Sequence, residues 1–144
     1  DLTIMEEGSE LISRIQNKAN QFILSELKKF GLEDLAPIHG DILLALFFHQ
    51  RITMQDLATL VDRKKSTITT LVEKLIRLGY VQKEKSDTDN RYFLISLTEK
   101  GQSLKVPLIS LSTELIQTVY GDMPMKDRTK LVELLGVLNQ NLTK

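Results

Sequence analysis

The clearest chemistry in the sequence lies between residues 63 and 77, where cationic side chains stand beside small hydroxyl side chains. The residues concerned are Arg63, Lys64, Lys65, Ser66, Thr67, Thr69, Thr70, Lys74 and Arg77. Lysine and arginine neutralise phosphates, and small hydroxyl residues allow close approach while exchanging hydrogen bonds with base edges. This combination points to contact with a nucleic acid rather than to catalysis.

A second set of cations, Lys83, Lys85 and Arg91, follows in the next part of the chain. The whole sequence is neutral, with 19 Lys+Arg and 19 Asp+Glu, yet residues 63–91 carry eight basic residues against four acidic ones. A hydroxyl-rich helix face or a Lys-Lys pair is, by itself, more often a solvated surface than a contact. Their concentration in one segment favours a docking site for a polyanion.

The spacing of apolar residues predicts the elements that must position these side chains. From Ser66 to Leu78 the apolar residues recur with helical spacing, which leaves the hydroxyl residues on the opposite face. Thr53 is the predicted N-cap of a shorter preceding helix. Two strands are predicted after these helices, over 80–85 and 91–97, with turn chemistry between them. Helix, tight turn, helix and hairpin in this order predict a winged helix-turn-helix.

The rest of the chain is predicted to be helical. One helix is expected from Ile4 to Phe30, and a second, too apolar for a surface element, from Pro37. After the hairpin, Thr98 is expected to cap one long helix that Pro107 bends in its early turns. A last helix is expected to begin near Pro124.

The predicted fold class is therefore mainly α with a small β-hairpin wing, in which helical dimerisation regions flank a winged helix-turn-helix. We expect a single domain over 1–144, with a DNA-binding lobe over 37–101. The dimerisation regions are expected over 1–36 and 102–144. Their Leu and Ile stripes are too long for one chain of this size to cover, so a second copy is expected to bury them. An intrachain helical subdomain is the alternative.

Other kinds of chemistry find little support in the sequence. It has no cysteine and only two histidines, His39 and His49, which would lie roughly 15 Å apart along one helix, too far to share a metal. No catalytic constellation, metal site or cofactor motif is found, so we expect neither an enzyme nor a cofactor. The longest apolar stretch, 42–48, is too short to cross a membrane, and we expect a cytoplasmic protein. Because the sequence begins at Asp1, we expect residues to precede it in the natural chain.

The segment that carries these motifs resembles the MarR family of bacterial and archaeal transcriptional regulators. The resemblance rests on residues 54–58, 65–75 and 78–81, and on Asp89-Asn90-Arg91 followed by Leu97-Thr98 and Gly101. The last group fits the family's D-x-R…L-T-x-x-G signature. The resemblance extends over nearly the whole chain, since the first and the last two helices fit the family's dimerisation elements.

The resemblance implies a homodimer on a pseudo-palindromic operator in double-stranded DNA, usually repressing transcription and often released by a small molecule. It implies that Arg91 enters the minor groove, that Asp89 braces this arginine, and that the second helix contacts DNA through Lys65, Ser66, Thr67, Thr69 and Thr70. Lys83 and Lys85 would meet phosphates. Together with the first run of cations, the predicted DNA-binding residues are Arg63, Lys64, Lys65, Ser66, Thr67, Thr69, Thr70, Lys74, Lys83, Lys85, Asp89 and Arg91.

Two further expectations stay open at this point. Phe22, His39 and Phe47 are candidates for lining an effector cavity, although such residues more often belong to the core. The alternative function is a winged-helix module for protein–protein assembly that has no operator of its own.

Overall fold

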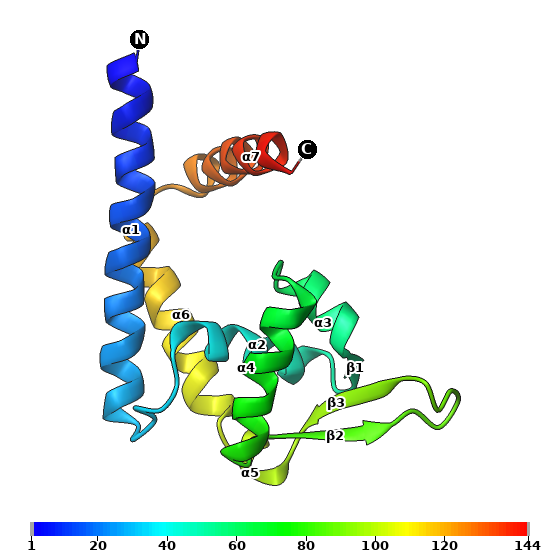
Figure 1. Ribbon diagram of the computed structural model, residues 1–144. Helices are drawn as coiled ribbons and strands as arrows, with labels where there is room; N and C mark the ends of the chain where they lie inside the picture. The colour runs from blue at the N-terminus through cyan, green and yellow to red at the C-terminus, as the bar shows by residue number, and fades with distance from the viewer. Residues whose placement is uncertain (1, 144) are drawn as a thin grey trace. The chain divides into compact units, whose positions relative to one another are not determined.

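The computed structural model describes residues 2–143. Its elements, in chain order, are α1 (Leu2–Lys29), α2 (Pro37–Phe48), β1 (Ile52–Thr53), α3 (Met54–Leu60), α4 (Lys65–Arg77), β2 (Val81–Lys85), β3 (Phe93–Leu97), α5 (Glu99–Gln102), α6 (Lys105–Tyr120) and α7 (Met125–Leu142) (Figure 1). The chain divides into two compact units, residues 1–112 and 113–144. The expected fold class, mainly helical with a small β wing, is confirmed.

α1 is buried only towards its C-terminal end. Leu27 is 1% exposed in the core, whereas Leu11, Ile12 and Ile15 are each about half exposed. The helix ends before Gly31, whose φ of +73° is a conformation that glycine adopts without steric cost. The expected first helix is therefore present, with its N-terminal apolar stripe uncovered within the described chain.

α2 supplies the centre of the core in the first unit. Ile42, Leu43 and Leu46 are at most 1% exposed, as the apolar run in this helix predicts. Phe48, the last residue of the helix, is 72% exposed and lies outside the core. The elements α1, α3, α4 and β3 all pack against α2, which presents apolar side chains to each of them.

α3 and α4 form the helix-turn-helix. The backbone N–H of Asp56 donates to the Thr53 hydroxyl at 3.1 Å, which confirms Thr53 as the N-cap of α3. α4 buries Ile68, Val72 and Leu75 completely, and this apolar face fixes the direction of the opposite face.

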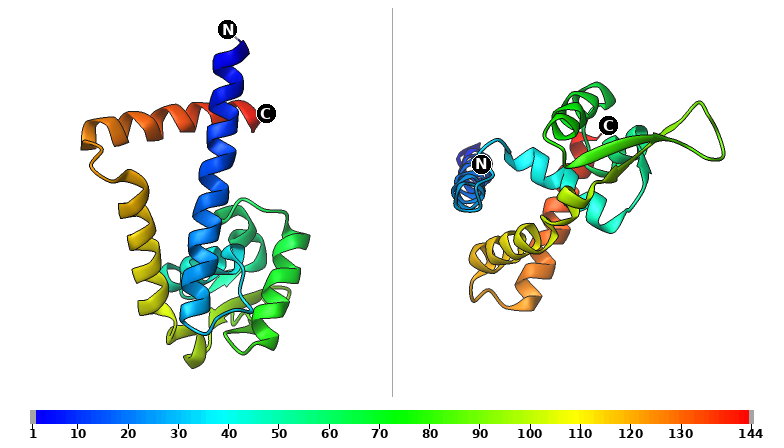
Figure 2. Two further views of the ribbon diagram at one scale, coloured as in Figure 1. Left: turned by 90° about the vertical axis from the view of Figure 1, so that its left-hand side faces the viewer. Right: turned by 90° about the horizontal axis from the view of Figure 1, so that it is seen from below.

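The wing is a hairpin within a three-stranded antiparallel sheet of order β1-β3-β2. Val81 pairs with Leu97 and Lys85 with Phe93, and the hairpin projects beyond the helices of its unit (Figures 1 and 2). The third strand, β1, was not expected from the sequence. It is only two residues long, and Ile52 pairs with Ile95.

The predicted long helix after Thr98 is wrong in one respect, because the structure divides it into α5 and α6. In a continuous helix the Pro107 ring would clash with the carbonyl of Ser103, four residues earlier. The α-helix is therefore interrupted by a turn at 103–104 and resumes at Lys105. Pro107 then sits in the first turn of α6, where a missing N–H is tolerated, instead of bending a long helix.

The base of the wing is held by Thr98 and Gly101. The Thr98 hydroxyl donates to the carbonyl of Gly79 and accepts from the N–H of Gly101 at 3.1 Å. A Cβ on Gly101 would overlap the carbonyl oxygen of Tyr80. Glycine at 101 is thus required for the close approach of α5 to the chain entering β2.

The second unit contains the end of α6 and the whole of α7. Between them, Gly121 has a φ of +54°, and Arg128 donates from Nε to the carbonyl of Met123 at 2.8 Å and from Nη2 to that of Gly121 at 3.0 Å. α7 has no buried residue. The expected last helix near Pro124 is present, with its apolar residues uncovered within the described chain.

Candidate nucleic-acid interface

The exposed face of α4 carries the predicted hydroxyl residues. With Ile68, Val72 and Leu75 buried, the 3.6-residue period turns Ser66, Thr70 and their neighbours outward. Ser66, Thr67 and Thr70 are exposed, and Thr69 is half-buried on a flank. The exposed face of α4 therefore carries small, polar side chains, which allow another surface to approach the helix closely.

The hydroxyls of this face fall into two kinds. Thr69 Oγ1 donates to the carbonyl of Lys65 at 2.8 Å, and Thr70 Oγ1 donates to that of Ser66 at 3.2 Å. Within residues 2–143, the Ser66 and Thr67 hydroxyls have no hydrogen-bond partner. Ser66 and Thr67 can therefore donate to a ligand, whereas Thr69 and Thr70 present a lone pair and a methyl group.

Asp89 and Arg91 form a closed ion pair at the tip of the wing. Arg91 donates from Nη2 to Asp89 Oδ2 at 2.8 Å and from Nε to Oδ1 at 3.1 Å, and its backbone N–H reaches Oδ1 at 3.0 Å. These bonds, led by the side-chain one, hold the pKa of the Asp89 carboxyl below its usual value. The Arg91 side chain is nevertheless 83% exposed, so the carboxylate orients it without covering it.

Lys83, in the middle of β2, lies over an aromatic ring. Its Nζ lies 4.6 Å from the centroid of the Phe93 ring, and Phe93 is itself 42% exposed. Arg91 lies against Tyr92 in the same way, with Cζ 5.9 Å from the ring centroid. A cation over a ring face is attracted by the ring quadrupole, which limits the directions these charges can take.

A groove of about 230 Å³ lies between the start of α3, the start of α4 and the wing. Its lining residues are Thr53, Met54, Gln55, Lys65, Thr69, Lys83, Arg91, Tyr92 and Phe93. Three predicted cations, Lys65, Lys83 and Arg91, thus converge on one concave surface although they lie far apart in the sequence. Such a surface favours an anion.

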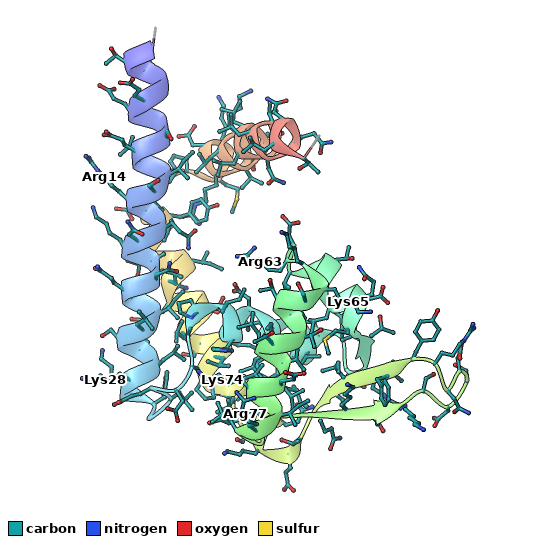
Figure 3. All side chains as sticks on the ribbon, in the orientation of Figure 1. Arg14, Lys28, Arg63, Lys65, Lys74 and Arg77 are labelled. Carbon is teal, nitrogen blue, oxygen red and sulfur yellow. The ribbon has the colours of Figure 1, made fainter. Side chains whose placement is uncertain are left out.

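The other predicted cations lie outside this groove. Arg63 stands before α4 (Figure 3). It donates to the carbonyl of Asp62 at 3.0 Å. Lys64 is the N-cap residue of α4, and Lys85 ends β2. At about 100° per residue, Lys74 lies on the opposite side of α4 from Lys65, and its charge acts on His39 of α2.

Sequence reasoning missed three polar residues of the groove: Thr53 as a lining residue, Gln55 and Tyr92. Gln55 follows the N-cap of α3 and Tyr92 follows the wing arginine. A polar residue at the start of the first helix of a helix-turn-helix was the available signal for Gln55. No local signal places Tyr92 beside α3 and α4, because only the folded hairpin brings them together.

The three candidates for an effector cavity lie in or beside the core. Phe47 is 7% and His39 4% exposed, and Phe22 is half-buried against the core cluster. Their assignment to an effector cavity stays a prediction. Within residues 2–143 no group of three or more His, Cys, Asp or Glu side chains could hold a metal, and no helix is both long and apolar enough to traverse a bilayer.

Comparison with protein families places these elements in a known class. A family model described as a winged helix DNA-binding domain matches residues 42–101. The HTH-type transcriptional regulator SarZ of Staphylococcus saprophyticus is 32% identical over 111 residues, which cover 77% of this chain and 73% of that protein. SarZ of Staphylococcus aureus is 31% identical over 87 residues, so the chain spans 56% of its length.

Solved structures share the fold across almost the whole chain. MepR of S. aureus in complex with DNA superposes with a TM-score of 0.84 at 24% identity, covering 92% of this chain and 96% of that one. A MarR mutant from E. coli complexed with operator DNA gives a TM-score of 0.79 at 19% identity, covering 90% and 91%. A MarR regulator from Methanosarcina mazei gives 0.77 at 20% identity, covering 94% and 96%.

Proposed function

Because the chain belongs to the MarR family of winged helix-turn-helix transcriptional regulators, we propose that it binds a pseudo-palindromic operator as a homodimer. In this proposal it acts in the cytoplasm, represses transcription from that operator and is released by a small-molecule effector. The observation that carries the DNA-binding part is the convergence of Lys65, Lys83 and Arg91 on one groove beside the hydroxyl face of α4.

The exposed face of α4 is proposed to read bases in the major groove. A single α-helix fits the major groove, and small hydroxyl side chains let its backbone approach the base edges. Ser66 and Thr67, which have free hydroxyls and lie in the first turn, are the proposed donors, and the helix N-terminus itself favours phosphate. Thr70, on the same face, offers an acceptor and a methyl group.

The wing is proposed to enter the minor groove next to that major groove. Where α4 and the wing occupy neighbouring grooves, the sugar-phosphate strand that separates the two grooves must pass between them. The cationic groove lies at that place, between α4 and the hairpin. Lys65 and Lys83 would then meet phosphates of this strand, and Arg91 would extend beyond it into the minor groove.

The homodimer is proposed from the uncovered apolar faces of the terminal helices. On α7 these residues are Leu131, Val132, Leu134, Leu135, Val137, Leu138 and Leu142, each between 37% and 87% exposed. Leu11, Ile12 and Ile15 of α1 are also about half exposed. Apolar patches of this extent are not kept in water, and pairing with a second copy would bury them.

Dimerisation would also set the geometry of DNA recognition. Two recognition helices reach successive major grooves on one face of the duplex only when they lie about 34–36 Å apart. A small molecule that changes this spacing would change DNA affinity, and DNA would change the affinity for that molecule to the same extent. Phe22, His39 and Phe47 remain the candidates for contacting it.

The salt dependence of DNA binding tests the proposal. We expect affinity for a duplex of mixed sequence to fall with salt, and Lys83→Gln to reduce the slope of log K against log salt by about 0.9, one phosphate contact. Lys28→Gln, an exposed lysine in α1, is the matched control and should leave the slope unchanged. Absence of salt-dependent binding would favour the alternative, a protein–protein module without an operator.

A further inference from the structure

His39 is a buried histidine at the start of α2. It occupies the third position of the helix, and its side chain is 4% exposed. The sequence contains one other histidine, His49, which follows the last residue of the same helix and is exposed. One histidine is therefore buried near the start of α2, and the other is exposed just after its end.

The His39 ring holds the first turn of α2 through Nδ1. The backbone N–H of Ala36, the N-cap residue, donates to His39 Nδ1 at 2.8 Å. Ala36 has no side chain that could cap the helix, and Pro37 at the first position has no N–H of its own. His39 thus supplies half of a capping box, at the position where Glu or Gln usually does so.

This hydrogen bond requires the neutral ring. Nδ1 can accept only when it carries no proton, so the ring hydrogen must be on Nε2. Nε2 is buried and has no hydrogen-bond partner within residues 2–143. A proton added at Nδ1 would point at the Ala36 N–H, and the resulting charge would be buried without a partner.

The electrostatic surroundings of the ring also oppose protonation. Burial lowers the pKa of His39, and the positive charge of Lys74 on α4 lowers it further. The other elements packed on α2 are α1, α3 and β3. Within the described chain, none of them contributes a charged group that shifts this pKa, so no acid compensates the effect of Lys74.

We propose that His39 is a proton-operated latch between the start of α2 and α4. Neutral His39 holds the Ala36 amide and carries no charge for Lys74 of α4 to repel. Protonated His39 releases the amide and repels Lys74, which loosens the contact between the two helices. Because α2 carries the packing of the winged-helix lobe, this lobe loses stability when the latch opens.

The direction of the pH effect follows from the lowered pKa of His39. The unfolded chain binds a proton at His39 near the ordinary pKa of about 6.5, and the folded chain binds it only at lower pH. The stabilisation is therefore complete above that value and is lost progressively as the pH falls below it. In this range the folding equilibrium constant falls by up to about tenfold per pH unit.

Urea unfolding at several pH values tests the latch. Wild type and His49→Gln should both lose stability below about pH 6.5, since His49 is exposed in the folded chain. His39→Gln keeps an acceptor at the capping position but does not titrate, so it should lose this part of the pH dependence. An unchanged pH dependence in His39→Gln would overturn the proposal.

A second measurement does not depend on any variant. Titration of the His39 ring by NMR in the folded wild type should give a pKa below the ordinary histidine value of about 6.5, with the ring hydrogen on Nε2. A His39 pKa at or above that ordinary value, or a hydrogen on Nδ1, would refute the latch even if His39→Gln fails to fold.

Discussion

The carboxylate of Asp89 accepts hydrogen bonds from the guanidinium of Arg91, two residues later in the chain. The guanidinium nevertheless stays exposed at the tip of the wing. Three hydrogen bonds from the guanidinium, at 2.8, 3.1 and 3.2 Å, and one from the Arg91 backbone N–H, at 3.0 Å, fix the loop and the side chain together. A carboxylate at this position weakens DNA binding through its negative charge. It also strengthens DNA binding by orienting the arginine. Because the two effects change DNA affinity in opposite directions, a substitution of Asp89 shows which of them is larger.

We expect Asp89→Ala to weaken DNA binding although it removes a negative charge. Arg91→Ala should weaken binding by about tenfold, as loss of a groove contact does. The double variant should bind no worse than Arg91→Ala, because without the arginine only the unfavourable charge of Asp89 remains to be removed. Fluorescence anisotropy with a fixed duplex measures all four affinities, and tighter binding by Asp89→Ala would show that its charge effect dominates.

Ser66 and Thr70 should contribute unequally to base recognition. The Ser66 hydroxyl is free to donate, whereas the Thr70 hydroxyl already donates to the carbonyl of Ser66 at 3.2 Å. We expect Ser66→Ala to lower operator affinity by roughly tenfold, and Thr70→Val, which keeps the methyl group, by less than about threefold. Equal losses, measured on the same operator fragment, would contradict this assignment of donors.

The apolar stripe of α7 should determine the oligomeric state. The double substitution of Leu135→Glu with Leu138→Glu puts two charges on the stripe and should produce a monomer. Glu133 lies about 140–160° around the helix from Leu135 and Leu138, so Glu133→Lys should remain a dimer. Sedimentation equilibrium distinguishes the species, and an unchanged mass for the double variant would place the dimer contact elsewhere.

Substitution by alanine should change the stability of the protein in opposite directions at two glycines. Gly101→Ala drives a Cβ into the Tyr80 carbonyl and should destabilise the chain by about 1–3 kcal/mol. Gly40, within α2, has open space around a Cβ, so Gly40→Ala should stabilise by up to about 1 kcal/mol. Urea unfolding measures the change in the free energy of unfolding for both variants. Equal changes would show that the close approach of residue 101 to the Tyr80 carbonyl does not determine stability.

The sequence predicts the helices well because their signals are local. The Ser66–Leu78 prediction differs by one residue at each end from α4, and Thr53 caps α3 as expected. β1 was missed since a two-residue strand carries no period of its own and exists only through pairing with Ile95 and Leu94. The break before α6 was missed because Pro107 was expected to bend a helix that it instead restarts.

In the candidate interface, too, the features with a local sequence signal could be predicted and those that depend on the fold could not. Ser66 and Thr70 could be assigned to the exposed face of α4 from their spacing alone. The groove joins Lys65, Lys83 and Arg91 with Gln55 and Tyr92, and only the folded hairpin brings these together. The effect of the Lys74 charge on the pKa of His39 likewise depends on how α2 packs on α4, which periodicity does not reveal.

Hydroxyl-radical footprinting on a fragment selected from genomic DNA tests the central claim most directly. Two copies that each place α4 in a major groove should protect two windows about 10–10.5 bp apart, centre to centre, on a pseudo-palindromic sequence. Ser66→Ala should weaken both windows together. A single protected window, or no fragment retained by the protein, would contradict a dimer that reads DNA through α4.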